Sequence, residues 1–288
     1  MSDGSLRLDV LVAFAVDMIN DDPFLAESTR RETVIKIRQF YGYLRDEGVS
    51  TIDEVTREHV ESFVHLPTYR GGRATNPQAS TRRNRRAAIR NLYRALRGLG
   101  YEVGDPTLDV AALLDRTATG FICGTEEIVR LREAAPLGFF RSPLPSLLAL
   151  AEAGATNTEI AHLTASNING SEVELPGNLR VEARINRLTV WGREVIAERL
   201  EDLEDDKEVL ASSGLRQISN GAVSNGLRAI AEFAGLRDRG VTINSIRAWR
   251  AREILLEKES LEDAAKFLGS RSLDAAAAMI GYRWGDAS

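Results

Sequence analysis

Apolar residues recur every three to four positions along most of this chain, a spacing that predicts a protein built mainly from α-helices. In the first third, helices are expected over 27–48 and over 51–66, where Thr56 is the expected N-cap. The segment 5–20 has enough apolar positions for a helix, but its alternating start is also typical of a strand. Residues 67–79 are rich in proline and glycine and are expected to form a loop.

The second half of the chain keeps the helical spacing except in one stretch. Val173 and Leu175 alternate with acidic residues, a Pro-Gly-Asn turn follows at 176–178, and apolar residues return up to Val190. This pattern predicts a β-hairpin, and therefore a small sheet within a helical region. Helices are expected on either side of it, over 125–135, 143–153, 192–203 and 219–235, with three more over 241–282.

A break in the pattern falls between Gly104 and Gly120, where proline and glycine punctuate the chain. Domain boundaries commonly fall in such segments, and a chain of 288 residues is long enough for two cores. We therefore expect two domains, at 27–104 and 121–288, joined by a linker at 105–120. Residues 1–26 are expected to be an N-terminal arm or a packing helix.

The composition is that of an ordinary soluble protein, with 43% hydrophobic and 27% charged residues. No apolar run approaches the roughly 20 residues of a membrane span, and the N-terminus lacks the features of a signal peptide. We therefore expect a cytoplasmic protein with no membrane partner. The single cysteine, Cys123, and three scattered histidines argue against a metal site, and no cofactor is expected.

The net charge of −5 argues mildly against nucleic acid as a partner, but the distribution of charge matters more. The segment 80–98 carries seven arginines and no acidic residue: Arg82, Arg83, Arg85, Arg86, Arg90, Arg94 and Arg97. All except Arg83 and Arg85 run along one face of the expected helix, away from its apolar seam. This stripe is either a solvated face or a surface for a phosphate backbone. We favour the second, because uncompensated arginines repel one another unless an anion is near.

The last expected helices carry two short boxes and a third single position at defined spacing. Residues 244–247 read Asn-Ser-Ile-Arg, and residues 268–270 read Leu-Gly-Ser. Met279 stands nine residues beyond the second box, and Tyr282 follows three residues later. This frame resembles the catalytic core of the tyrosine recombinase/integrase family, in which the boxes are His-x-x-Arg, Leu-Gly-His and a tyrosine nucleophile.

By that resemblance, Arg247 is the one charged family residue that this frame retains. Asn244, Ser270 and Met279 stand at positions where the family has histidine, histidine and tyrosine. Tyr282 is the nearest candidate nucleophile. Tyr282 is therefore expected one helical turn late, because a shift of three residues keeps roughly the same helix face but moves the side chain about 4.5 Å along the axis.

Two earlier stretches carry the same resemblance. Residues 153–160 are similar to the family's Thr-Gly-x-Arg-x-x-Glu-Leu segment, with Thr156 in place of the arginine that grips the scissile phosphate. A threonine hydroxyl cannot make bidentate, charge-assisted contacts to a phosphate. In the expected hairpin, Asn178 stands near the family's lysine general acid. Arg184 or Arg187 could supply charge there, but arginine is a poor proton donor.

The resemblance covers about 27–282 and implies a mainly α fold. Its first part is similar to the family's helical core-binding (SAM-like) domain, which clamps one side of a DNA duplex. Its second part is similar to the α+β catalytic-type domain, with a small β-sheet or hairpin. The family's active members exchange C-terminal segments between protomers, so residues 272–288 are a candidate contact in a homo-oligomer.

The resemblance implies a protein that binds double-stranded DNA but has lost most catalytic residues, an architectural or regulatory pseudo-recombinase of the nucleoid. Two alternatives stay open. One is an active recombinase for DNA integration, with Tyr282 as a displaced nucleophile and Arg247 at the phosphate; the other is a protein-interaction scaffold that no longer binds DNA. The expected DNA contacts are Arg82, Arg83, Arg86, Arg90, Arg94, Arg97, Arg247 and Arg271.

Overall fold

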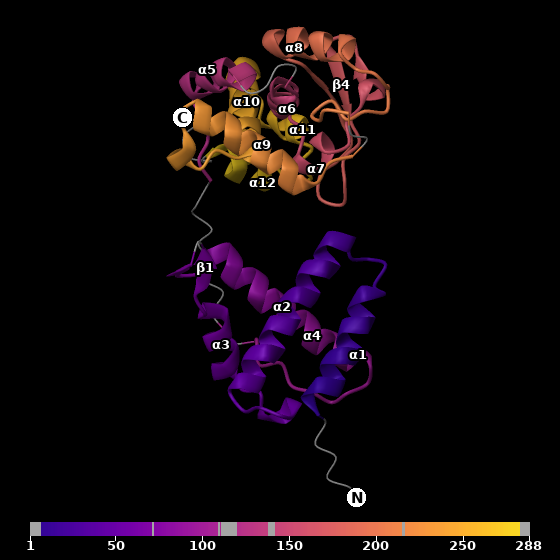
Figure 1. Cartoon of the computed structure of the whole chain (residues 1–288), viewed down its shortest axis with the longest axis vertical. Helices are drawn as coiled ribbons and strands as arrows, with labels where there is room; N and C mark the ends of the chain where they lie inside the picture. Colours follow the sequence, from indigo (N-terminus) through magenta and orange to yellow (C-terminus); the bar gives the residue numbers. More distant parts are fainter. Residues whose placement is uncertain are drawn as a thin grey trace, which may run out of the picture. The chain divides into compact units, whose positions relative to one another are not determined.

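The computed structural model describes residues 7–70, 72–108, 110, 120–137, 142–214 and 217–282. The chain divides into two compact units, Met1–Thr117 and Ala118–Ser288 (Figure 1). Most of the expected linker, at 109 and 111–119, lies outside the described residues, as do residues 283–288 of the expected exchange segment. No helix in the described ranges is long and apolar enough to cross a membrane.

In its described ranges, the first unit has four helices around one apolar core. They are α1 (Leu8–Asn20), α2 (Glu27–Asp46), α3 (Arg57–His65) and α4 (Ala79–Gly98), with a 3₁₀ turn at Ile52–Glu54. The N-terminal segment is a packing helix, because α1 lies against α2 and α4 and buries one whole side in their core. Thr56 precedes α3 as expected, and its backbone N–H donates to the ring of His59 at 3.1 Å.

A short antiparallel hairpin lies within the expected loop before α4. Its strands are β1 (Thr68–Arg70) and β2 (Arg73–Thr75). The hydroxyls of Thr68 and Thr75 meet across the strands at 3.0 Å. Every residue of β2 is exposed, so the alternation of buried and polar positions that identifies a strand is absent from this sequence.

Residues 105–108, expected to begin the linker, pack against α4 in the first unit. Thr107 is fully buried. Its carbonyl accepts from Arg86 Nη2 at 2.9 Å, and its hydroxyl donates to Asp105 at 2.6 Å. Arg97 reaches the same carboxylate at 3.4 Å. The arginines of α4 therefore hold a returning segment of chain, a long-range contact that helical spacing does not encode.

Tyr93 of α4 is a buried side chain whose hydroxyl has no hydrogen-bond partner among the described residues. Burial raises the pKa of its phenol, so the group stays neutral. We expect Tyr93→Phe to leave the free energy of unfolding unchanged or to raise it by about 1–2 kcal/mol, since it removes an unsatisfied polar atom and keeps the ring. Urea denaturation measures this, with the exposed Tyr69→Phe as the control. A clear loss of stability would show that the hydroxyl has a partner.

The second unit combines eight helices in its described ranges with a three-stranded sheet. The helices are α5 (Thr125–Ala134), α6 (Leu144–Glu152), α7 (Asn157–Ile160), α8 (Val190–Glu201), α9 (Asn220–Phe233), α10 (Ile243–Lys258), α11 (Leu261–Leu268) and α12 (Leu273–Ile280). Shorter 3₁₀ turns lie at Ala135–Leu137, Ala165–Asn167 and Arg237–Arg239. The expected final stretch of three helices is present as α10 to α12.

The sheet is antiparallel with strand order β3-β4-β5, formed by Ile168–Asn169, Glu172–Leu175 and Arg184–Arg187. The hairpin predicted from alternation is β4 and β5, paired from Glu172 opposite Arg187 to Leu175 opposite Arg184. Its turn depends on Gly177, which has a φ of +73°. A Cβ built there would lie 2.6 Å from the carbonyl oxygen of Val181.

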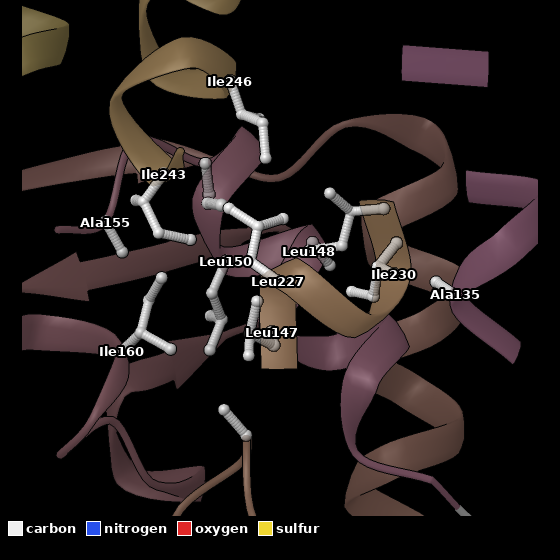
Figure 2. Close-up of a cluster of buried hydrophobic side chains, with 14 of the residues drawn as sticks. Ala135, Leu147, Leu148, Leu150, Ala155, Ile160, Leu227, Ile230, Ile243 and Ile246 are labelled. Atoms are coloured by element: carbon white, nitrogen blue, oxygen red, sulfur yellow. The ribbon is translucent and has the colours of Figure 1, made fainter. Parts of the chain in front are cut away.

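The core of the second unit is centred on α6, whose residues 146–152 are all buried. Figure 2 shows Leu147, Leu148 and Leu150 of this helix among side chains of α9 and α10. A helix that is apolar on all sides belongs inside a unit. A separate small cluster joins α10, α11 and α12, so the C-terminal helices have an apolar core of their own.

Candidate functional site

The chain reverses sharply after α6 at Gly154, and this turn organises the surrounding polar groups. Gly154 has a φ of +91°, and a Cβ there would lie 2.8 Å from both the Asn186 amide and the Phe267 ring. Glycine is therefore required. The turn presents the Gly154 carbonyl to two guanidinium groups, Arg184 Nη2 at 2.6 Å and Arg247 Nε at 2.8 Å.

Arg184, on β5, uses every one of its N–H groups inside the second unit. It makes a bidentate pair with Glu159 at 2.9 and 3.1 Å. Its remaining donors reach the carbonyl oxygens of Gly154, Glu182 and Phe267. The side chains of Arg184 and Glu159 are 6% and 1% exposed. Arg184, considered from sequence as a source of charge for a missing lysine, is a structural residue that joins four segments.

Glu159 is the anion at the centre of this arrangement. Besides Arg184, it accepts hydrogen bonds from the backbone N–H groups of Thr156 at 2.7 Å and Gly177 at 3.1 Å. Burial alone would raise the pKa of Glu159, but the hydrogen bonds from Arg184 and Thr156 outweigh it and hold the pKa below its usual value. The carboxylate therefore ties α7, the hairpin turn and β5 together in its charged form.

Arg247, on the first turns of α10, is a buried cation with neutral partners. It donates to the Gly154 carbonyl, to Asn244 Oδ1 at 2.9 Å and to the Leu268 carbonyl at 2.8 Å. Among the described residues, no carboxylate lies within ion-pair distance of it. Burial and then the charge of Arg184 lower the pKa of Arg247 to about 10, and Glu159 offsets this only in part. Arg184 and Arg247 thus meet at the Gly154 carbonyl, but Glu159 pairs only with Arg184, which leaves the described cluster with an excess of positive charge.

The positions at which this sequence lacks the residue of the tyrosine recombinase family lie in two parts of the second unit. Asn244 is exposed and lies directly beside Arg247 through its amide oxygen. Thr156 caps α7 by accepting from the Glu159 N–H at 3.3 Å, so its hydroxyl serves the helix end. Asn178 also has a local role, because its side-chain oxygen accepts from the N–H groups of Arg180 and Val181 in the hairpin turn.

The remaining positions follow α11. Ser270 donates its hydroxyl to the Ser272 carbonyl at 2.8 Å. Arg271 is exposed and lies 4.0 Å from the Glu182 carboxylate. Met279 and Tyr282 pack against the cluster of α10 to α12. Tyr282 lies beyond the end of α12, after a left-handed Gly281 with a φ of +69°, so the expectation that it continues the helix face by one turn is wrong.

The arginines of α4 divide by what they contact. Arg85 is buried and donates to the last carbonyls of α3, and Arg86, Arg90 and Arg97 reach Thr107 or Asp105. Arg94 donates to Asn91. Arg83 is exposed, with one contact to the Ala79 carbonyl, and Arg82 is half-buried. The role of these arginines as DNA contacts stays a prediction. More of them are engaged in contacts with other protein groups than the sequence suggested.

Sequence reasoning missed the ion pair of Glu159 and Arg184. The two residues are separated by 25 positions in the chain, and no periodic pattern relates them. The available signal was Gly154, because a glycine between an apolar helix and a capped turn often marks a close approach of backbone. The two guanidinium groups that meet there come from β5 and α10.

No protein-family model matches this sequence, and no curated protein matches it. Solved structures do match. A lambda integrase dimer bound to a COC′ core site shares 17% identity with a TM-score of 0.74, over 99% of this chain and 81% of that chain. XerH site-specific recombinase bound to difH substrate, in a pre-cleavage complex, shares 13% identity with a TM-score of 0.64, over 98% and 89% of the two chains.

The Tn1549 transposon integrase in complex with transposon right end DNA is similar at 9% identity and a TM-score of 0.61, over 95% of each chain. These matches span nearly all of the present chain. They confirm the mainly α architecture with a small antiparallel sheet that the sequence predicted. This chain therefore has the fold of the tyrosine recombinases and integrases.

Proposed function

We propose that this protein binds double-stranded DNA and does not cut it. The observation that carries the proposal is the excess positive charge around Arg247, a buried guanidinium with only neutral partners among the described residues. A buried cation without an anion is unfavourable, and a phosphate oxygen is the partner that a guanidinium recognises best. Asn244, exposed beside it, adds an amide that can donate to the same phosphate.

The first unit supports the proposal with exposed cations at one end of α4. Arg73 of β2 and Arg83 are exposed and form no ion pair with another described residue. The first turn of α4 carries no acidic residue, so the positive end of the helix dipole adds to this charge. The lambda, XerH and Tn1549 structures, which share this fold, are all bound to DNA.

Cleavage needs more than binding. A phosphodiester transfer needs a nucleophile, positive charge around the reacting phosphorus and an acid for the leaving oxygen. The described α12 contains no tyrosine, the hairpin turn contains no lysine, and Arg184 is fully engaged with protein groups. An architectural or regulatory role therefore suits these residues better than recombination.

Binding is tested by a gel shift of the purified protein against sheared DNA of its own genome, at about 50 and 200 mM salt, with the retained DNA sequenced. We expect retention at the lower salt and a steep loss at the higher salt, because phosphate contacts release counterions. No retention at low salt would contradict the proposal and leave the protein-interaction scaffold.

Non-cleavage is tested on the retained DNA by denaturing the complex and looking for DNA covalently bound to protein. We expect no adduct with the wild-type chain. An adduct that disappears in Tyr282→Phe, while the gel shift persists, would identify Tyr282 as a displaced nucleophile. That outcome would establish the active recombinase instead.

A further inference from the structure

The first unit carries an apolar groove that the DNA-binding proposal does not use. It lies along the outer face of α1, the segment after it and the end of α4, with a cavity volume of about 730 Å³. That volume is within the range of about 300–1,000 Å³ typical of ligand sites. Its apolar lining includes Phe14, Met18, Phe24, Ala95 and Leu99.

The exposed apolar residues of α1 follow a helical stripe. Val10, Phe14 and Met18 are spaced by four residues and are 44%, 48% and 41% exposed. The opposite side of α1 is already buried in the core, so this stripe is a second apolar face. Phe24, which is 90% exposed, stands at one end of it. A helix with two apolar faces is expected to pack on two sides. Here Met18 lies beside Gly98 of α4, but all three side chains of the stripe stay exposed.

The rim of the groove is acidic. Asp17, Asp21 and Asp22 line it, and Arg94 is the single cation in its lining. Asp22 accepts from the Phe24 N–H at 2.8 Å, but none of the three forms an ion pair with another described residue. Such a rim repels phosphates, so the groove is a poor surface for DNA although Arg94, an expected DNA contact, lines it.

We propose that this groove is a docking surface for an amphipathic helix of another protein, with an apolar face and basic flanking residues. The apolar floor accepts side chains spaced at three and four positions, and the three carboxylates select lysine or arginine beside them. A second copy of α1 does not fit, because pairing two such stripes would bring like carboxylates together. The expected partner is therefore a helix with one apolar face that is flanked by lysine or arginine residues.

The experiment uses two labelled synthetic peptides that share a leucine stripe at helical spacing, one flanked by lysines and one by glutamates. Fluorescence anisotropy with the full chain is expected to show the lysine peptide binding at least about tenfold more tightly. The double variant Asp17→Lys/Asp21→Lys is expected to reverse this preference. Phe14→Glu is expected to abolish binding, and Leu256→Glu, an exposed leucine of the second unit, to leave it unchanged.

Three outcomes would overturn the inference: equal affinity for both peptides, no affinity for either, or an unchanged preference in the double variant. A fourth outcome would also overturn it. If sedimentation showed that the wild-type chain is a dimer and that Phe14→Glu is a monomer, a second copy of the chain would fill the groove. A gel shift of the same variant distinguishes failure of this proposal from failure of the DNA-binding proposal. Phe14→Glu is expected to retain DNA whatever its effect on the peptide.

Discussion

Glu159→Gln is expected to lower the free energy of unfolding of the second unit by about 3–5 kcal/mol, because it removes the carboxylate from a buried cluster that holds two guanidinium groups. The substitution keeps the size and shape of the side chain. Its amide group would point N–H donors at the donors of Arg184. The variant therefore isolates the loss of charge and of hydrogen-bond acceptance.

The matched control is Glu172→Gln on β4, the strand that pairs with the β5 strand of Arg184. Glu172 pairs with Arg187 at 3.7 Å, but the two side chains are 42% and 84% exposed. An exposed pair of this kind contributes about 0–1 kcal/mol. Urea denaturation of the two variants is expected to separate them clearly. Equal midpoints would mean that the buried pair contributes no more than a surface pair.

A double variant distinguishes the ion pair from the packing around it. Arg184→Met alone leaves Glu159 buried without its cation and is expected to destabilise the unit strongly. Adding Glu159→Leu removes the stranded charge and is expected to restore part of the loss, since buried pairs can often be replaced by apolar residues of similar size. Destabilisation that simply adds would contradict the coupling.

The charge of Glu159 makes the free energy of unfolding of the second unit depend on pH in the acid range. The folded-state pKa of Glu159 is lowered, so its contribution is complete above the unfolded-state pKa of about 4.3 and is lost as the pH falls through the lower, folded-state value. The gap in stability between wild type and Glu159→Gln is therefore expected to be constant near neutral pH and to close in this acid range. A gap that stays constant down to acid denaturation would contradict the charged pair.

Helical spacing predicted the main elements because apolar side chains at three and four positions must face a common core. It placed α2, α3 and α9 and the β4–β5 hairpin, and it offered a packing helix at α1 as one of two alternatives. The β1–β2 hairpin was missed because β2, exposed at every residue, shows no alternation of buried and exposed side chains. The expected last helix reached Tyr282, but α12 ends at Ile280 with a left-handed Gly281, a stop signal that was present in the sequence and was not used.

The chemistry of the candidate site was harder to predict because its contacts are long-range. The sequence singled out Arg247 as the one charged family residue in the frame, a prediction that stays open, but it gave no sign that Arg184 reaches the same carbonyl of Gly154. It also treated the arginines of α4 as one stripe. Arg86, Arg90 and Arg97 instead hold Thr107 and Asp105, contacts made with residues beyond the end of the helix.

This division changes which variants test DNA binding. Substituting Arg86 or Arg90 would release the segment around Thr107, so a loss of binding could arise from a loss of structure. Arg73 and Arg83 avoid that difficulty, because both are exposed and neither forms an ion pair with another described residue. They lie in β2 and at the N-terminal end of α4, two elements separated by only a few residues.

Arg73→Glu/Arg83→Glu is expected to weaken DNA binding by about 100-fold at 50 mM salt, since each change removes one phosphate contact and adds repulsion. The dependence of log affinity on log salt should become less steep by about 1 for each lost contact. The measurement is a salt titration by gel shift or anisotropy, with urea denaturation to confirm that the first unit remains folded.

The control is Arg7→Glu, which alters the net charge by two for one substitution but touches an arginine already paired with Asp9 at 2.7 Å. We expect this variant to change the affinity only slightly and to keep the wild-type slope. A loss about half as large on the logarithmic scale, matching its half-sized change in net charge, would mean that binding follows net charge alone. If Arg73→Glu/Arg83→Glu kept full affinity for DNA, the DNA contact would have to lie elsewhere than the N-terminal end of α4.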